Sequence, residues 1–482
     1  MSASANKKTL LWIGIVFVFQ FLLGKLPPIG QMTPMGMHVF FILVGTILGW
    51  IFVGMGLPSL SGIIALGFSG AFPSMTACIS ACLGSQMTWL IAGTIFLCHV
   101  INKTNLADYI VGFMLNLKLS RKSPFILSFF MFLTVYAISA VSNFFVAIML
   151  IISLYRTLSE KAGIPSGSII NSYWLCGCAF SCVSGGMYVP WQASALILGG
   201  MYTSATGIAF SNLHWIICGM GGAILFIILY VLFGRFVLRI DLSAFDPNVI
   251  QVKQVKANKE QKAALLYLLA LLLLMVIPTS FPNSTFFLFQ FFNTLGLGGT
   301  MFVLLLAMMI IPVNDKPLLD LKEVNFDWNT FLMAAFYPTI ASFIANDAAG
   351  ITATMAGVLG PVLDKIPGVF FVIVCIYLAM VASQFLNNMV VSIIFISAVT
   401  AIAESFSGIN LAAAVMAIYM GSNAVCALPS ANPVNAITFS NTDLIKFKNQ
   451  TFVGWTSNFA MATFAVVLYF VMTFYFSMFG LV

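Results

Sequence analysis

The sequence predicts an all-α polytopic membrane protein with about 11 transmembrane spans and two re-entrant hairpins. Of the 482 residues, 61% are hydrophobic and only 7% are charged, and the apolar residues form long unbroken runs. Soluble domains are about 45–50% apolar and about 25% charged, so a water-facing globule would leave much apolar surface exposed. A membrane β-barrel would instead show ~10-residue segments of alternating polarity. The composition therefore excludes soluble enzymes, nucleic-acid binders and disordered scaffolds.

Runs of ~20 apolar residues, separated by charges and by Pro or Gly, mark the candidate spans. The predicted spans cover residues 9–26, 36–57, 58–71, 86–102, 168–205, 212–238, 263–281, 290–312, 327–345, 410–443 and 452–480. The first run follows Lys7 and Lys8 and has no small-residue cleavage site after it. We therefore expect a first membrane span there and not a signal peptide.

Two further stretches are too long for one crossing and have legs that are short for two, namely residues 124–158 and 368–403. The first is divided by Ser142 and Asn143, and the second by Asn387 and Asn388. Within a bilayer, non-helical backbone is tolerated only where it is buried in protein or lines a cavity. We therefore predict two re-entrant hairpins whose polar tips reach the middle of the membrane.

The positive charges predict the orientation of the chain. If the N-terminus is cytoplasmic and each hairpin returns to its own side, only Lys25 and Lys365 of the 20 Lys and Arg residues fall outside the cytoplasm. Cytoplasmic loops of membrane proteins carry an excess of Lys and Arg. The N-terminus is thus predicted to be cytoplasmic and the C-terminus to lie outside.

The two halves of the chain repeat in opposite orientation. Each half has a span that opens with Trp89 or Trp328, then a weakly polar stretch, a hairpin and a helix broken by proline. Such inverted repeats are typical of secondary transporters that bind at the bilayer midplane. The predicted organisation is N-terminal scaffold spans at 1–85, a first repeat at 86–239 with hairpin 124–158 and broken helix 168–205, a cytoplasmic linker at 240–262, connecting scaffold spans at 263–326, and a second repeat at 327–482 with hairpin 368–403 and broken helix 410–443.

Neutral polar residues occupy the hairpin tips and the second helix break. Besides the tip residues, the break contains Pro429, Asn432, Pro433 and Asn435. Ser and Asn offer neutral oxygens to Na⁺ and amide N–H groups to a carboxylate, and broken helices add free backbone donors and acceptors. An anion at a helix N-terminus needs no basic side chain. Asparagines in membrane helices also serve only as interhelical contacts, but their recurrence at both tips favours a binding site.

These motifs resemble the divalent anion/sodium symporter (DASS) family of the ion-transporter superfamily. The resemblance rests on the two hairpins, the stretch Leu26-Pro-Pro-Ile-Gly-Gln-Met-Thr-Pro34 and the break Pro429-Ser-Ala-Asn-Pro-Val-Asn-Ala-Ile437. It implies a secondary carrier of small anions such as di- or tricarboxylates, without an organic cofactor, in a family that includes both sodium-coupled carriers and exchangers. It also implies a homodimer in which a transport domain moves like an elevator against a fixed scaffold. We expect this carrier to lie in the cell inner (plasma) membrane.

The resemblance also implies which residues form the site. Family members carry Ser-Asn-Thr at each tip, whereas here Phe144 and Met389 replace the threonines and Asn387 replaces the second serine. These changes make the site more apolar and predict an altered substrate or weaker carboxylate recognition. By resemblance, the substrate-binding residues are Ser142, Asn143, Asn387, Asn388, Asn432 and Pro433, and the sodium-binding residues are Ser142, Asn143, Gly186, Asn388 and Ala431.

The positions of the acidic residues and histidines favour some coupling mechanisms over others. All 13 Asp and Glu residues lie in predicted loops, interfaces or hairpin bases, and His38, His99 and His214 lie near span ends. Proton-coupled carriers usually rely on an intramembrane carboxylate or histidine. Sodium coupling, or exchange without a coupling ion, is therefore favoured. The alternatives are a sodium-independent anion exchanger and a non-transporting membrane scaffold or receptor with a degenerate site. An enzyme is disfavoured, because no catalytic constellation lies at membrane depth.

Overall fold

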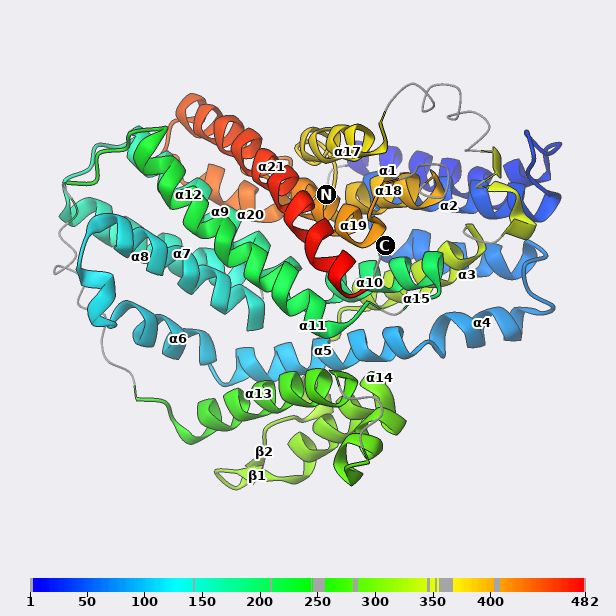
Figure 1. Ribbon diagram of the computed structural model, residues 1–482, viewed down its shortest axis with the longest axis horizontal. Coiled ribbons are helices and arrows are strands. Elements are labelled where there is room, and N and C mark those ends of the chain that lie inside the picture. The colour runs from blue at the N-terminus through cyan, green and yellow to red at the C-terminus, as the bar shows by residue number, and fades with distance from the viewer. Residues whose placement is uncertain are drawn as a thin grey trace.

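The computed structural model describes residues 3–141, 144–208, 210–243, 245, 256–280, 285–344, 347–351, 353–354, 367–402 and 408–480. These residues are mostly helical (Figure 1). Strands β1 (Pro312–Val313) and β2 (Lys316–Pro317) form a short antiparallel hairpin in which Pro312 lies opposite Pro317. The predicted all-α class is confirmed, and the β-hairpin is a small addition to it.

The first half of the chain forms helices that begin and end close to the predicted polar breaks. In chain order they are α1 (Ala3–Phe17), continued by short turns to Lys25, α2 (Pro34–Phe52), α3 (Gly56–Phe68), α4 (Met75–Leu83), α5 (Gln86–Lys103), α6 (Leu106–Leu115), α7 (Pro124–Val141), α8 (Phe144–Lys161), α9 (Ile169–Met187), α10 (Ala193–Thr206), α11 (Asn212–His214) and α12 (Gly221–Phe236). Capping residues start several of them. At α2, for example, Thr33 Oγ1 accepts from the Gly36 amide at 3.1 Å, and Pro34 fills the first helical position.

The described part of the second half is also mostly helical. Its helices are α13 (Lys259–Ser280), α14 (Phe287–Ile310), α15 (Trp328–Ile344), α17 (Gly368–Ala382), α18 (Asn388–Ile402), α19 (Leu411–Asn423), α20 (Pro433–Ser440) and α21 (Phe447–Met478). Helix α14 bends by 104° near Gly296, whose φ of 64° favours glycine. Helix pair α17–α18 packs on α19, just as α7–α8 packs on α9.

The number of membrane crossings stays a prediction. Among the described residues, five helices are long and apolar enough to cross a membrane alone, and two bent pairs raise this to seven. Both predicted broken helices consist of two helices separated by non-helical backbone, at 188–192 and 424–432. Helix α7 forms the first leg of the predicted hairpin 124–158. It has 18 residues and is long enough to cross the membrane alone, whereas the prediction made this leg too short to do so.

The arrangement in space separates two groups of helices. In Figure 1, α7–α9 and α12 lie on one side of the molecule and α1–α4 on the other, with α5 between them. Helices α13 and α14 lie alongside α5, and the β-hairpin lies against α13 and α14. Helix α21 packs against α9, α17 and α19, so the last helix contacts both predicted repeats.

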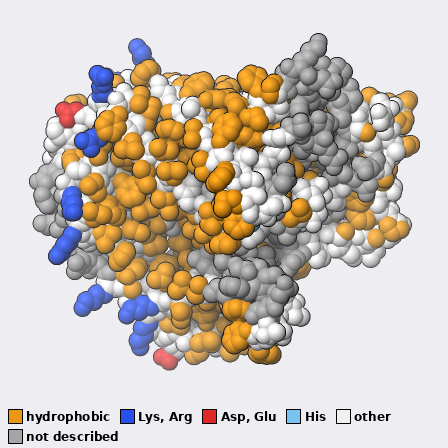
Figure 2. Space-filling model, viewed as in Figure 1, with side chains coloured by type: hydrophobic (Ala, Val, Ile, Leu, Met, Phe, Trp, Pro, Cys, Tyr) orange, Lys and Arg blue, Asp and Glu red, His pale blue; other side chains and the backbone are white. Residues whose placement is uncertain are grey.

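The surface is apolar over most of the face shown in Figure 2, and the Lys and Arg side chains visible there lie along one edge. Large apolar side chains such as Leu266, Phe287 and Phe474 are 65%, 72% and 71% exposed. Exposed apolar surface of this extent is typical of a protein surrounded by lipid.

Candidate functional site

A cavity of about 210 Å³ lies where the second hairpin tip meets the second helix break. Its lining comes from both halves of the chain: Met55, Phe144, Val183, Met187, Asn387, Asn388, Asn432, Pro433 and Val434. A second hollow of about 300 Å³ shares Asn387, Asn432 and Pro433 with the first, and is also lined by Ile51 and Ala431. The two hollows therefore surround the same short stretches of α18 and α20.

The structure brings together most of the residues singled out in the sequence. Asn387, Asn388, Asn432 and Pro433 line the cavity, and Ala431 lines the adjoining hollow. Gly186 lies on α9 between the lining residues Val183 and Met187, and a Cβ there would lie 3.2 Å from the Phe144 ring. Ser142 and Asn143 lie outside the described residues. Their roles as ligands stay predictions.

The second hairpin tip holds its two asparagines in different ways. Asn387 caps α18, because its Oδ1 accepts from the backbone amides of Met389 at 2.9 Å and Val390 at 3.4 Å. The Asn388 side chain is only 3% exposed and donates through Nδ2 to Asn423 Oδ1 at 3.3 Å. Within the described part of the chain, Asn388 Oδ1 has no hydrogen-bond partner. An unpaired buried acceptor is costly, so this atom points to a ligand.

The second break is held by hydrogen bonds to α21 and to the turn that follows α17. The Cys426 amide donates to Asn458 Oδ1 of α21 at 3.0 Å, and the Ala427 amide donates to Gln384 Oε1 at 3.3 Å. Ser430 Oγ donates to the Gln384 carbonyl at 2.8 Å. Unwound backbone in a membrane protein needs such partners, because lipid offers none.

Helix α20 then starts at the cavity. Asn432 caps it by accepting from the Asn435 amide at 2.8 Å, and Pro433 takes the first helical position. Asn435 Nδ2 donates back to the Leu428 carbonyl at 3.1 Å. Asn432 Nδ2 and Asn435 Oδ1 are buried without partners among the described residues. The break therefore presents an unpaired amide donor and an unpaired acceptor.

The first break is tied to the first hairpin and to the other half. Trp191 Nε1 and Gln192 Nε2 donate to the Ala140 carbonyl at 2.7 Å and 3.1 Å, next to the first tip. The two halves also exchange tyrosine hydrogen bonds: Tyr188 Oη donates to the Met420 carbonyl at 3.1 Å, and Tyr419 Oη donates to the Met187 carbonyl at 2.8 Å.

The electrostatics of the cavity come from helix ends and amides. Helices α18 and α20 begin at Asn388 and Pro433, and both residues line the cavity. A helix N-terminus carries about half a positive charge, so these two favour an anion. None of the described lining residues is charged. The site can thus bind an anion through dipoles and amide groups.

Comparison with known families identifies the chain. The profile of the CitMHS citrate transporter family matches residues 38–391. The chain belongs to this family. The DASS resemblance is thereby confirmed, since the CitMHS family is related to the DASS carriers. As a CitMHS member, the chain is a multi-pass membrane transporter of small anions and not an enzyme.

A solved structure shows the same fold. The crystal structure of the Alcanivorax borkumensis YdaH transporter is similar over 98% of each chain, with 15% sequence identity and a TM-score of 0.52. At this identity the similarity concerns the fold alone. A search of curated protein sequences found no match.

Several residues that shape the site of this CitMHS chain were not predicted. The predicted site residues do not include Trp191, Gln192, Gln384, Tyr188 or Tyr419. Gln384 stands three residues before Asn387. A side-chain amide within an apolar run indicates a functional or structural role, so Gln384 could have been predicted from the sequence. For the tyrosines no local signal exists, because each bonds a carbonyl 232 residues away.

The lining also predicts how binding depends on pH. Because none of the described lining residues is titratable, the charge of this part of the CitMHS site does not change near neutrality. Between about pH 7 and 8.5, where carboxylates are almost fully ionised, the KM for uptake should change by less than about twofold. Uptake into vesicles at fixed membrane potential measures this. A steep change in KM would show that a titratable group takes part in binding.

Proposed function

We propose that this transporter is a sodium-coupled carrier of citrate or a related di- or tricarboxylate in the plasma membrane. The observation that carries the proposal is a cavity where the N-termini of α18 and α20 meet three asparagines, with no charged residue among the described lining residues. The substrate class follows the citrate transporter family that matches the chain. Phe144 and Met389 in place of the family threonines allow a narrower or altered choice of carboxylate.

Sodium fits the unpaired oxygens of the site. Asn388 Oδ1 and Asn435 Oδ1 are buried acceptors without partners in the described chain, and neutral oxygens of this kind suit Na⁺. We propose that Asn388 and Ala431 hold one ion, and that Ser142, Asn143 and Gly186 hold another. Bound sodium would supply positive charge next to the anion. A carboxylate oxygen of the substrate then accepts from amide groups such as Asn432 Nδ2.

An elevator movement accounts for the position of the cavity. Met55 and Ile51 come from the α2–α3 region, which the sequence assigns to the scaffold at 1–85, and the other lining residues come from the two repeats. In our proposal the hairpins and broken helices move as one body past this region and past the scaffold spans at 263–326. The scaffold also forms the interface of a homodimer, as the resemblance implies.

Uptake by proteoliposomes tests the proposal. The purified protein should take up labelled citrate or succinate saturably, and an inward Na⁺ gradient should raise the initial rate several-fold over an equal K⁺ gradient. A panel with sulfate and monocarboxylates defines the substrate class. Counterflow that needs no sodium would instead support an anion exchanger. If no anion of the panel were taken up, the proposed function would be wrong.

A further inference from the structure

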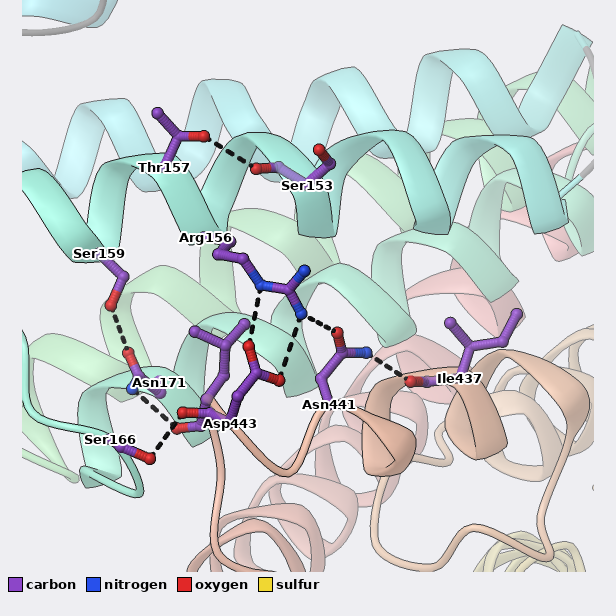
Figure 3. Close-up of polar contacts among 10 residues, drawn as sticks. Ser153, Arg156, Thr157, Ser159, Ser166, Asn171, Ile437, Asn441 and Asp443 are labelled. Carbon is purple, nitrogen blue, oxygen red and sulfur yellow. Dashed lines mark hydrogen bonds and ion pairs between the residues drawn. The ribbon is translucent and has the colours of Figure 1, made fainter.

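Arg156, near the end of α8, reaches across to the loop that follows α20 (Figure 3). Its Nε lies 3.0 Å from Asp443 Oδ2, and its Nη2 donates to Asp443 Oδ1 at 3.2 Å. The same Nη2 donates to Asn441 Oδ1 at 2.8 Å. Arg156 belongs to the predicted first repeat and the other two residues to the second. We refer to Arg156, Asn441 and Asp443 as the inter-repeat clamp.

Further hydrogen bonds fix the backbone around the clamp. Ser166 Oγ donates to the Asp443 carbonyl at 2.6 Å, and Asn171 Nδ2 donates to the Leu444 carbonyl at 2.8 Å. Asn171 is fully buried, and its Oδ1 accepts from Tyr155 Oη at 2.7 Å. An isolated exposed ion pair contributes little to stability. Here, however, a planar guanidinium binds two partners on a loop that is itself held in place.

The clamp connects directly to the cavity through two helices. Helices α8 and α20 begin at Phe144 and Pro433, both of which line the cavity, and the two helices pack against each other. Arg156 lies twelve residues after Phe144, roughly 18 Å along α8, and so does not touch a ligand in the cavity.

Helix α20 depends on the bonds at its two ends. It has only eight residues, and so short a helix is unstable without tertiary support. At the cavity its cap is Asn432. At the far end Asn441 Nδ2 donates to the Ile437 carbonyl at 2.7 Å, and Arg156 holds the oxygen of the same amide.

We infer that Arg156 is a positioning residue that fixes α20 against α8 and thereby sets the affinity of the cavity for its anion. This inference rests on the proposed transport function. Loss of the guanidinium frees Asn441 and leaves Asp443 unneutralised beside the C-terminal end of α20, where a negative charge is unfavourable. Asn432 and Pro433 then lose their fixed place at the other end of the helix.

The test compares Arg156→Gln with Lys103→Gln. Lys103 forms an ion pair of similar exposure with Glu323 at 2.6 Å, at the end of α5 and away from α20. In Arg156→Gln the KM for citrate uptake should rise about threefold to tenfold, while the maximal rate per folded transporter stays near the wild-type value. In Lys103→Gln the KM and the maximal rate should both be unchanged. The double variant Arg156→Asp with Asp443→Arg, which exchanges the two charges, should recover at least half of the affinity that Arg156→Gln loses.

A second measurement needs no transport. Hydrogen exchange of the α20 amides in the purified full-length protein should be faster in Arg156→Gln and unchanged in Lys103→Gln. Unchanged exchange in Arg156→Gln, or a lower maximal rate with an unchanged KM, would overturn the inference and leave Arg156 a surface contact. If the wild-type protein takes up no anion, the proposed function fails, whereas the exchange experiment still decides whether the clamp positions α20.

Discussion

Replacing Asn388 with alanine should lower kcat/KM for anion uptake by about 10- to 100-fold, because it removes the oxygen proposed to hold Na⁺ beside the anion, and loss of an interaction with a charged group costs about 1.5–3 kcal/mol. Asn388 lines the cavity, is 3% exposed and presents an unpaired Oδ1. Alanine would also remove the donor to Asn423 Oδ1. Initial uptake rates in proteoliposomes, at several substrate and sodium concentrations, measure the loss in each affinity.

Two further variants control this experiment. Thr400→Ala changes the same helix α18, but among the described residues its hydroxyl bonds only carbonyls of that helix, at Ile396 and Ser397. Its kcat/KM should stay within about twofold of wild type. Asn388→Asp keeps the shape and adds a negative charge, which should weaken anion binding even more than alanine does. Asn388→Ala with wild-type KM values for both anion and sodium would remove Asn388 from the site.

Replacing Gly454 with alanine should destabilise the protein by about 2 kcal/mol or more, as overpacking does in close-packed cores. Helix α21 passes the second break so closely at Gly454 that a Cβ would overlap Ala427 Cα and lie 2.6 Å from the Cys426 carbonyl oxygen. These are backbone atoms and have little freedom to move away. The melting temperature of the purified transporter in detergent should fall, and uptake should fall with it.

The matched control is Gly14→Ala on α1. A Cβ at Gly14 would meet nothing within 4 Å, so the melting temperature should stay at the wild-type value or rise slightly. Equal melting temperatures for Gly454→Ala and wild type would mean that the second break lies farther from α21 than the structure places it.

Much of the fold could be predicted because polar residues are rare in this chain. Polar residues and prolines within an apolar run are unfavourable in lipid and therefore indicate breaks in a helix. The structure contains the breaks indicated by Asn387 and Asn388 and by the stretch from Pro429 to Asn435. Helix α4 was not predicted, because its nine residues are too short for a hydropathy window tuned to full spans. The bend in α14 was missed because Gly296 lies among other glycines.

The candidate site could be predicted in part. The sequence identified Asn388, Asn432 and Pro433, and the structure gathers them around one cavity. What it could not predict are the partners that hold them. Gln384 and Asn458 bond the backbone of the second break only because α21 and the hairpin pack on it, and such neighbours come from the tertiary fold.

The exchanged hydrogen bonds of Tyr188 and Tyr419 have a thermodynamic consequence. Both side chains are fully buried, and each fixes the last turn of a helix in the opposite repeat. We therefore expect a ligand that orders α9 to order α19 as well. A first ligand that orders one half would lower the entropic cost of binding for the next, which is cooperativity without any contact between the ligands. Through the two tyrosines, the backbone of α9 and α19 would contribute to this cooperativity together with the residues that line the cavity.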